Sequence, residues 1–485
     1  MTGNASPNGT LYNLRTAAGL SQQDVAERMN DIANRDGRAG QVVTSNAVSR
    51  WERGYATPSP LYRRLLAEVF SVTVDELGLH LHREEPKTVR PEPAKYAYAE
   101  VEDVDLDPRV VHSQDAWRRT RRAMNAQRPG LTQLAAQVYD SSVRLGRTGL
   151  LTAPGWLPDE PVDLADIELT YDAAPPEPAI NGTEQESDNV RPRSNLTRHY
   201  PRYTQAVRDL DPPRLFESRP CWRMLDLEWT VGKGAMRFGP STYFAGVDTY
   251  EALAHETAFV HLDGDGSIGT KPPVMRDLPF RKLIGSPFDF GRRPLLPSID
   301  TLTIRQGPDG ASFILHKRDP RRVAVAGGML QVIPSGVFQP SSVLPSALNT
   351  DFDLWRNTQR EYSEELFGNP EHEGSGQPVS YDQEPFLSLD AARAEGRVRA
   401  LCLGVALDAL TLVGEILTVV VFDADVFDDL AHDFVEVNDE GTVINQRVPF
   451  TAEGIESIMN SGMIAPAGAG CIELAWQHRE SILGM

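Results

Sequence analysis

Three glutamates in the last third of the sequence have the spacing of a metal-binding helix. Glu361, Glu364 and Glu365 follow Arg360 within the segment RNTQREYSEELFG (356–368). On a helix these carboxylates share one face, where like charges repel one another unless a cation binds them. Clustered carboxylates beside a fixed arginine are what Mg²⁺-assisted diphosphate chemistry requires. The segment is therefore a candidate Mg²⁺ or ligand site.

A second set of polar residues, near the amino end, has the types and spacing that read DNA bases. Four of them fall at i, i+3, i+4 and i+7, which places them on one face of a helix: Asn46, Ser49, Arg50 and Arg53. In the major groove asparagine pairs with adenine and arginine with guanine, whereas serine is less selective. Thr44 or Ser45 is expected to cap this helix. The face is a candidate for direct contact with duplex DNA.

A third group is the arginine-rich stretch 191–223. It holds eight arginines against three acidic residues, and aromatic side chains lie between them. Guanidinium groups grip phosphate and aromatic rings stack on bases, so this composition suits an anionic, base-bearing ligand. The candidate ligand-binding residues are Arg191, Arg202, Arg219 and Arg223. The alternative is that these arginines neutralise the acidic surface of neighbouring domains.

Amphipathic helices between residues 10 and 78 must position the DNA-reading face. Helical periodicity runs through LRTAAGLSQQDVAERM (14–29), TSNAVSRWERG (44–54) and PLYRRLLAEVFSVTVDEL (60–77). Ser21 is expected to N-cap the second helix. The side chains expected to face inward are Leu11, Leu14, Val25, Ala26, Met29, Ala47, Val48 and Trp51. A short helix with one apolar and one polar side suits the major groove.

This segment resembles the Cro/repressor-type (XRE) helix-turn-helix family. The residues that carry the resemblance are Leu14, Arg15, Gly19, Leu20, Ser21, Gln22, Ala26, the run from Val48 to Gly54, Leu66 and Ala67. The resemblance implies a recognition helix from Ser45 to Arg53 and a DNA contact by Gln22. It also implies an internal salt bridge between Arg15 and Glu52. The segment 30–43 is longer than the family's usual link between helices two and three.

The acidic helix and its surroundings resemble the Nudix family. The resemblance covers roughly 300–485 and rests on R-E-x-x-E-E (360–365), on 311–340 and on the β-rich segment 400–423. It implies an α/β/α fold in which Glu361, Glu364 and Glu365 bind metal or activate water. Two features depart from the family motif. Gly336 precedes Arg360 by 24 positions where the motif has 14, and Phe352 stands where the motif has a glutamate.

The charge is distributed unevenly along the chain. The net charge is −20, yet residues 1–78 hold eight Arg, no Lys and eight acidic residues, so the remaining 407 residues carry the whole excess. An acidic body weakens nonspecific attraction to phosphates. Binding to an operator is therefore expected to depend on base contacts and on a homodimer.

Composition narrows the class of protein further. A chain of 485 residues, 40% hydrophobic, suffices for roughly three globular domains. Three widely spaced cysteines argue against a disulfide scaffold or a zinc site and fit the cytoplasm. Neither a signal peptide nor the about 18 apolar residues of a membrane span is found. His255-Glu256 lacks a second histidine four residues on, where Phe259 stands, so a metalloprotease site is not expected.

The expected organisation is multidomain. An all-α helix-turn-helix domain (1–79) and a linker (80–108) precede a helical segment (109–150) that is a candidate for dimerisation. An α/β middle region (151–299), with a hairpin turn at VGKGAMRFG (231–239), leads to the Nudix-like α/β/α domain (300–485). Two helices, Ser113–Gln127 and Leu131–Leu145, are expected within 109–150.

These features predict a DNA-binding transcriptional regulator whose body senses a phosphorylated or nucleotide-like effector. Two alternatives stay open. One is an active Nudix-type pyrophosphohydrolase that regulates its own operator, and the other is a protein-protein platform without a small ligand. The altered first acid of the Nudix motif favours a sensor over an enzyme, because a binding pocket survives the loss of a metal ligand better than catalysis does.

Overall fold

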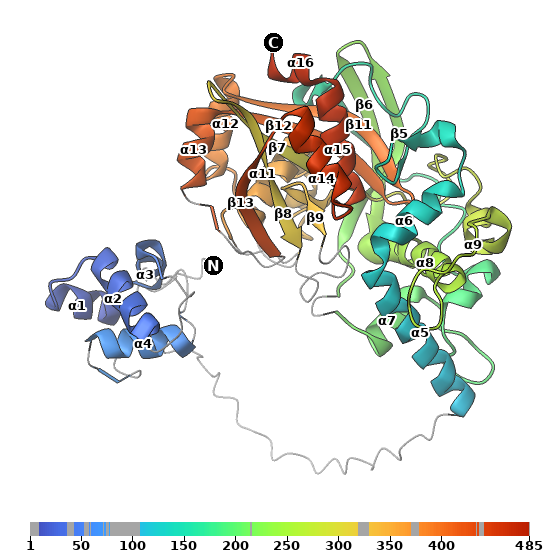
Figure 1. The fold of residues 1–485 in the computed structure, drawn as a ribbon, viewed down its shortest axis with the longest axis horizontal. Helices are drawn as coiled ribbons and strands as arrows, with labels where there is room; N and C mark the ends of the chain where they lie inside the picture. Colours follow the sequence, from blue (N-terminus) through green and yellow to red (C-terminus); the bar gives the residue numbers. More distant parts are fainter. Residues whose placement is uncertain are drawn as a thin grey trace. The chain divides into compact units, whose positions relative to one another are not determined.

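The computed structural model describes residues 9–35, 43–52, 58, 60–70, 72–73, 77, 107–213, 216–318, 329–369, 378–432, 434–435 and 441–484. The chain divides into two compact units, residues 1–103 and 104–485 (Figure 1). The first is helical and the second is a mixed α/β unit, as the sequence predicts. No helix among the described residues has the length and apolar character needed to cross a membrane.

The described residues of the first unit form helices α1 (Gly9–Ala17), α2 (Gln22–Arg35), α3 (Ser45–Glu52) and α4 (Pro60–Phe70). Their core confirms the predicted inward side chains, which are buried at Leu11, Val25, Ala26, Met29, Val48 and Trp51 and half-buried at Leu14 and Ala47. The spacing of these residues follows the helical period, so burying them fixes which face of each helix is left to solvent.

Helix α2 absorbs part of the long link that precedes α3. It starts as predicted, because the Ser21 hydroxyl accepts from the Asp24 backbone N–H at 3.1 Å and the Asp24 carboxylate accepts from the Ser21 N–H at 2.7 Å. It then continues to Arg35. The amide side chain of Asn30 binds the backbone N–H and C=O of Val43 at 2.7 and 2.9 Å. This two-point contact holds the chain where it returns towards α3.

The second unit contains helices on both faces of a large sheet (Figure 1). Its α-helices are α5 (Pro108–Ala126), α6 (Arg128–Gln137), α7 (Tyr203–Leu210), α8 (Tyr243–His261), α9 (Pro279–Ile284), α10 (Pro345–Thr350), α11 (Leu354–Glu365), α12 (Phe386–Ala394), α13 (Ala424–Ala431), α14 (Ala452–Asn460), α15 (Pro466–Gln477) and α16 (Arg479–Leu483). Its strands are β1 (Arg144–Leu145), β2 (Leu150–Leu151), β3 (Val162–Asp163), β4 (Ile167–Tyr171), β5 (Pro220–Thr230), β6 (Lys233–Thr242), β7 (Pro297–Gly307), β8 (Gly310–Arg318), β9 (Leu330–Gln331), β10 (Ser335–Val337), β11 (Val398–Asp408), β12 (Gly414–Asp423) and β13 (Gly441–Pro449).

The large sheet has the order β1-β2-β11-β12-β7-β8-β13, with β3, β9 and β10 attached to it. Strands β7 and β12 run parallel, and their side chains alternate between two cores. Leu302 and Val419 belong to the core that includes α15, whereas Ile299 and Phe422 belong to the core that includes Tyr362 of α11. A smaller sheet has the order β4-β6-β5.

Local hydrogen bonds explain where the helices of 109–150 differ from expectation. Helix α5 begins at Pro108, five residues early, because the Asp107 carboxylate accepts from the Arg109 N–H at 2.9 Å. Helix α6 ends at Gln137 instead of continuing to position 145. Beyond it, Asp140 accepts from the Ser142 N–H and turns the chain into β1. The hairpin predicted at VGKGAMRFG is confirmed, since β5 and β6 are antiparallel and Gly232 has φ +69°.

Candidate functional site

The candidate DNA-reading surface is the polar side of α3. The Thr44 hydroxyl accepts from the Ala47 N–H at 3.3 Å, so Thr44 caps the helix as predicted. Thr44 is exposed and Ser45 and Ser49 are half-buried, while Val48 and Trp51 face the core. The side chains of Asn46 and Arg50, and Arg53 as a whole, lie outside the described residues. The described part of α3 therefore leaves its polar side accessible.

A charged cluster joins the start of the first unit to the end of α3. Arg15 donates from Nε and Nη2 to the two carboxylate oxygens of Glu52 at 2.5 and 3.1 Å. Its Nη1 donates to the Leu20 carbonyl at 2.9 Å. Gln22, the expected DNA contact on α2, donates its amide N–H to Glu52 at 2.7 Å. The internal salt bridge between Arg15 and Glu52 is confirmed, and it fixes α1, the start of α2 and α3 together.

The acidic helix α11 is held from both sides. Asp353 caps it by accepting from the Arg356 N–H at 2.9 Å. Tyr362 is buried and its hydroxyl lies 2.7 Å from the Thr303 hydroxyl of β7. Arg360 is only 3% exposed and donates to the Asn357 side chain and the Gln339 carbonyl. The arginine of the motif therefore makes its hydrogen bonds in the interior of the domain.

Backbone groups of the loop around β10 meet the glutamates of α11. An added Cβ at Gly336 would overlap the Glu361 carboxylate, so this glycine provides the room for Glu361. Glu365 is buried and accepts from the Ser335 N–H at 3.1 Å. Glu364 is half-buried. Among the described residues, no three histidine, cysteine or acidic side chains come together in a group that could hold a metal ion.

A buried carboxyl pair lies beside this loop, and sequence reasoning missed it. Asp300 of β7 and Glu415 of β12 both contact the Ser298 hydroxyl. The Ser335 hydroxyl donates to Asp300 at 2.7 Å, so Ser335 connects this pair with Glu365. Burial and the charge of Asp300 raise the pKa of Glu415 far above its usual range. The available signal was Glu415, an acidic residue at the start of the mainly apolar run GEILTVVVF (414–422).

The structure disperses the arginine-rich segment. Arg191 is buried and donates to backbone carbonyls, including those of Tyr200 and Pro201. Arg223 is buried on β5 and donates to the Pro176 carbonyl at 2.5 Å. Arg219 is half-buried just before β5. Arg191 and Arg223 therefore satisfy carbonyls of the fold, and Arg202 stands apart from them.

Arg202 lines a cavity of about 300 Å³ between α7 and the first turns of α8. Its guanidinium is 43% exposed and donates to the buried Asp248 carboxylate at 3.0 Å. Asp248 also accepts from the Thr204 N–H at 2.8 Å, in the first turn of α7. The rest of the lining is mostly polar or cationic: Thr204, Gln205, Arg208, Thr242, Phe244 and Ala245.

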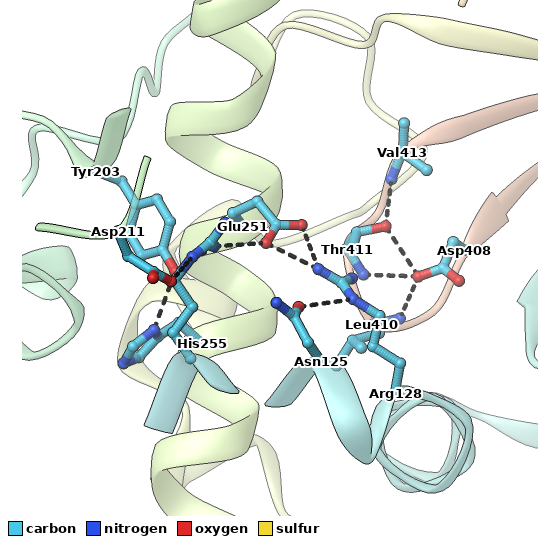
Figure 2. A network of polar contacts seen from close by, with 11 residues as sticks. Asn125, Arg128, Tyr203, Asp211, Glu251, His255, Asp408, Leu410, Thr411 and Val413 are labelled. Atoms are coloured by element: carbon cyan, nitrogen blue, oxygen red, sulfur yellow. Dashed lines mark hydrogen bonds and ion pairs between the residues drawn. The ribbon is translucent and has the colours of Figure 1, made fainter. Parts of the chain in front are cut away.

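A buried ion network joins helices α5, α6, α7 and α8 (Figure 2). Glu251 of α8 accepts from Arg121 of α5 at 3.2 Å and from Arg128 of α6 at 2.7 Å. Burial opposes ionisation of Glu251, but the two guanidinium groups outweigh it and lower its pKa. Arg121 also donates to the Tyr203 hydroxyl of α7 at 3.3 Å. One carboxylate thus holds two cations that come from different helices.

The His255-Glu256 pair has structural contacts. His255 stacks on the Trp117 ring with centroids 5.6 Å apart, and its Nδ1 lies 3.0 Å from the Tyr203 hydroxyl. Burial, together with the charge of Arg121, lowers the pKa of His255 to about 3. Glu256 accepts from the backbone N–H groups of Phe280 and Arg281 at the start of α9. His255 thus links α8 to α5 and α7, and Glu256 links α8 to α9.

In a comparison with known protein families, residues 11–80 match the SP15 N-terminal domain. The matched region contains α2, α3 and α4 and most of α1. A comparison of the chain with curated proteins finds no match. The family match therefore concerns the first unit alone.

Proposed function

We propose that the protein is a sequence-specific DNA-binding regulator whose second unit senses a small phosphorylated or nucleotide-like molecule. The observation that carries the proposal is the two-sided character of α3. Val48 and Trp51 fill the core, whereas Thr44 is exposed and Ser45 and Ser49 are partly accessible on the opposite side. The resemblance of residues 14–67 to the XRE family adds the role of a recognition helix.

The physical basis is rigid presentation of a short helix. The Thr44 cap defines where α3 begins, and the ion pair between Arg15 and Glu52 holds its last residue. A fixed helix loses little conformational freedom when it enters the major groove. Because residues 1–78 carry no net charge, affinity is proposed to come from base contacts made by Asn46 and Arg50 in two copies of the domain.

The experiment is binding-site selection from random duplex DNA, followed by affinity measurements on the selected site. The Arg50→Ala change is expected to cost about 1–3 kcal/mol and to flatten the preference at one base pair. Arg64→Ala, an exposed arginine on α4, is the matched control and keeps the base preference. If wild type and an Asn46→Ala, Arg50→Ala double variant select the same sequence, the assignment of α3 is wrong.

For residues 300–485 we propose a Nudix-like domain that binds a ligand and turns it over slowly or not at all. The contacts of α11 support this choice over the hydrolase. Glu361 lies close to Gly336 and pairs with Arg360 at 3.6 Å, and Glu365 accepts from the Ser335 N–H, so two of the three candidate metal ligands already have partners within the fold. Metal-assisted hydrolysis instead needs carboxylates that are directed at a shared metal ion and water.

A further inference from the structure

The cavity between α7 and α8 is lined by two arginines and by one aromatic residue, Phe244. We propose that it binds a small phosphorylated molecule that carries an aromatic ring, of the size of a nucleoside monophosphate. Its volume of about 300 Å³ is at the lower end of the range for ligand sites, which suits a molecule of that size. The proposal rests on the charge balance of the lining and on the position of one aromatic ring.

The charge balance of the lining favours an anion. The lining holds two guanidinium groups, Arg202 and Arg208, and one carboxylate, Asp248. Arg202 uses Nη1 for Asp248 and is 43% exposed, and a guanidinium has five N–H donors, so donors remain for a phosphate. Arg208 is 59% exposed, and among the described residues its ion pair is with its exposed chain neighbour Asp209 at 3.3 Å. A phosphate can engage both arginines without displacing a buried contact.

Uncharged groups add donors and a stacking surface. Thr204 and Gln205 of α7, together with Thr242, bring hydroxyl and amide groups to the same cavity. Phe244 lines it, and the Phe244 ring packs on Phe216 with ring centroids 4.5 Å apart. A supported ring offers a flat face on which a base stacks at little conformational cost. Phosphate recognition and ring recognition therefore occur within one small volume.

The position of the cavity gives such a ligand a route to the rest of the molecule. Asp248 and Thr204 of its wall lie near Glu251 and Tyr203, which belong to the ion network of Figure 2. That network holds Arg121 of α5, the first helix after the segment that joins the two units. The regulatory consequence rests on the proposed function, whereas the binding step stands without any DNA.

The binding step is tested by calorimetric titration of the full-length chain with adenosine and guanosine monophosphates, and separately with adenosine and inorganic phosphate. Both nucleotides are expected to bind more tightly than adenosine alone or inorganic phosphate alone. Arg208→Gln should weaken them about ten-fold or more, because a charge-assisted contact is lost. Phe244→Leu should weaken the nucleotides and leave inorganic phosphate unchanged. Arg276→Gln, an exposed arginine that also pairs with its chain neighbour, is the charge-matched control and should change nothing.

Two results would overturn the proposal: no heat of binding with either nucleotide at millimolar concentration, or binding that survives Arg208→Gln unchanged. Arg202→Gln is the second variant, but it removes the partner of the buried Asp248. If Arg202→Gln fails to fold, Arg208→Gln decides the case, because the Arg208 side chain is exposed. DNA affinity of the wild type is measured independently. Nucleotide binding without sequence-specific DNA binding would refute the proposed function alone. DNA binding without nucleotide binding would refute the proposed ligand site alone.

Discussion

The guanidinium of Arg15 and the carboxylate of Glu52 meet at two points, 2.5 and 3.1 Å, and so connect α1 to the end of α3. Their side chains are 13% and 4% exposed. Glu52→Gln should lower the free energy of unfolding of the first unit by about 2 kcal/mol, because a mostly buried cation loses its counter-charge. The measurement is urea unfolding of the first unit, followed by tryptophan fluorescence, to which Trp51 contributes.

The matched control for that prediction is the exposed pair of Arg35 and Glu68, which are 64% and 48% exposed. Glu68→Gln should cost less than about 0.5 kcal/mol. An Arg15→Met, Glu52→Met double variant should recover part of the loss, because no unpaired charge is left buried. Equal effects of Glu52→Gln and Glu68→Gln would show that burial gives the first pair no special role.

The ion network around Glu251 should dominate the stability of the helices at one end of the second unit. Glu251→Gln leaves Arg121 and Arg128 without their shared carboxylate and should cost about 3–5 kcal/mol. Its lowered pKa means that the charged form favours the fold. The contribution is present above the ordinary pKa of a glutamate and is lost as the pH falls below it. Glu228→Gln, an exposed glutamate on β5, is the control, and an equal loss there would contradict the prediction.

The buried pair of Asp300 and Glu415 should make the second unit less stable at higher pH. The folded state raises the pKa of Glu415, so its stabilising proton is fully held below the ordinary pKa of a glutamate and is lost as the pH rises through the folded value. Glu415→Gln should therefore flatten the alkaline fall in melting temperature, whereas Glu453→Gln, on the exposed start of α14, should leave it unchanged. Melting temperatures are measured from pH 5 to 9. The same dependence on pH in the wild type and in Glu415→Gln would refute this prediction.

The glutamates of α11 should support binding without rapid turnover. Nucleoside diphosphate derivatives with Mg²⁺ or Mn²⁺ are expected to raise the melting temperature and to be hydrolysed slowly or not at all. Glu364→Gln and Glu365→Gln are the variants, and product release is followed by chromatography. Rapid hydrolysis by the wild type that either change abolishes would establish the enzyme instead. The absence of any shift with any anionic ligand would favour a protein-protein platform.

If it reads DNA as proposed, the protein should act as a dimer on an inverted repeat, because one neutral helical domain covers too few base pairs to hold DNA alone. Helix α5 is the candidate for the dimer contact, since its exposed side carries Val111, Arg119 and Arg122. Arg119→Glu with Arg122→Glu should weaken the dimer. Light scattering of the free protein and of its DNA complex measures the mass, and a monomer in both states would rule out this arrangement.

Short-range patterns made the first unit predictable. The Ser21 and Thr44 caps and the inward positions of Val25, Met29 and Val48 involve residues within a few turns of one another. Helical periodicity and capping are local physics, and a sequence displays them directly. The Arg15–Glu52 pair spans 37 residues, and it was expected only because the segment resembles a known family.

Long-range contacts decided the rest of the candidate sites. The sequence by itself determined that residues 356–365 form an acidic helix and that 191–223 is rich in arginine. Only the tertiary structure engaged Glu365 with the Ser335 backbone, buried Arg191 and Arg223, and left Arg202 at a cavity. Glu251 likewise meets Arg121 across 130 positions of sequence. The physical reason is that a buried charge takes whichever partner the packing of distant elements brings to it, and no local pattern records that choice.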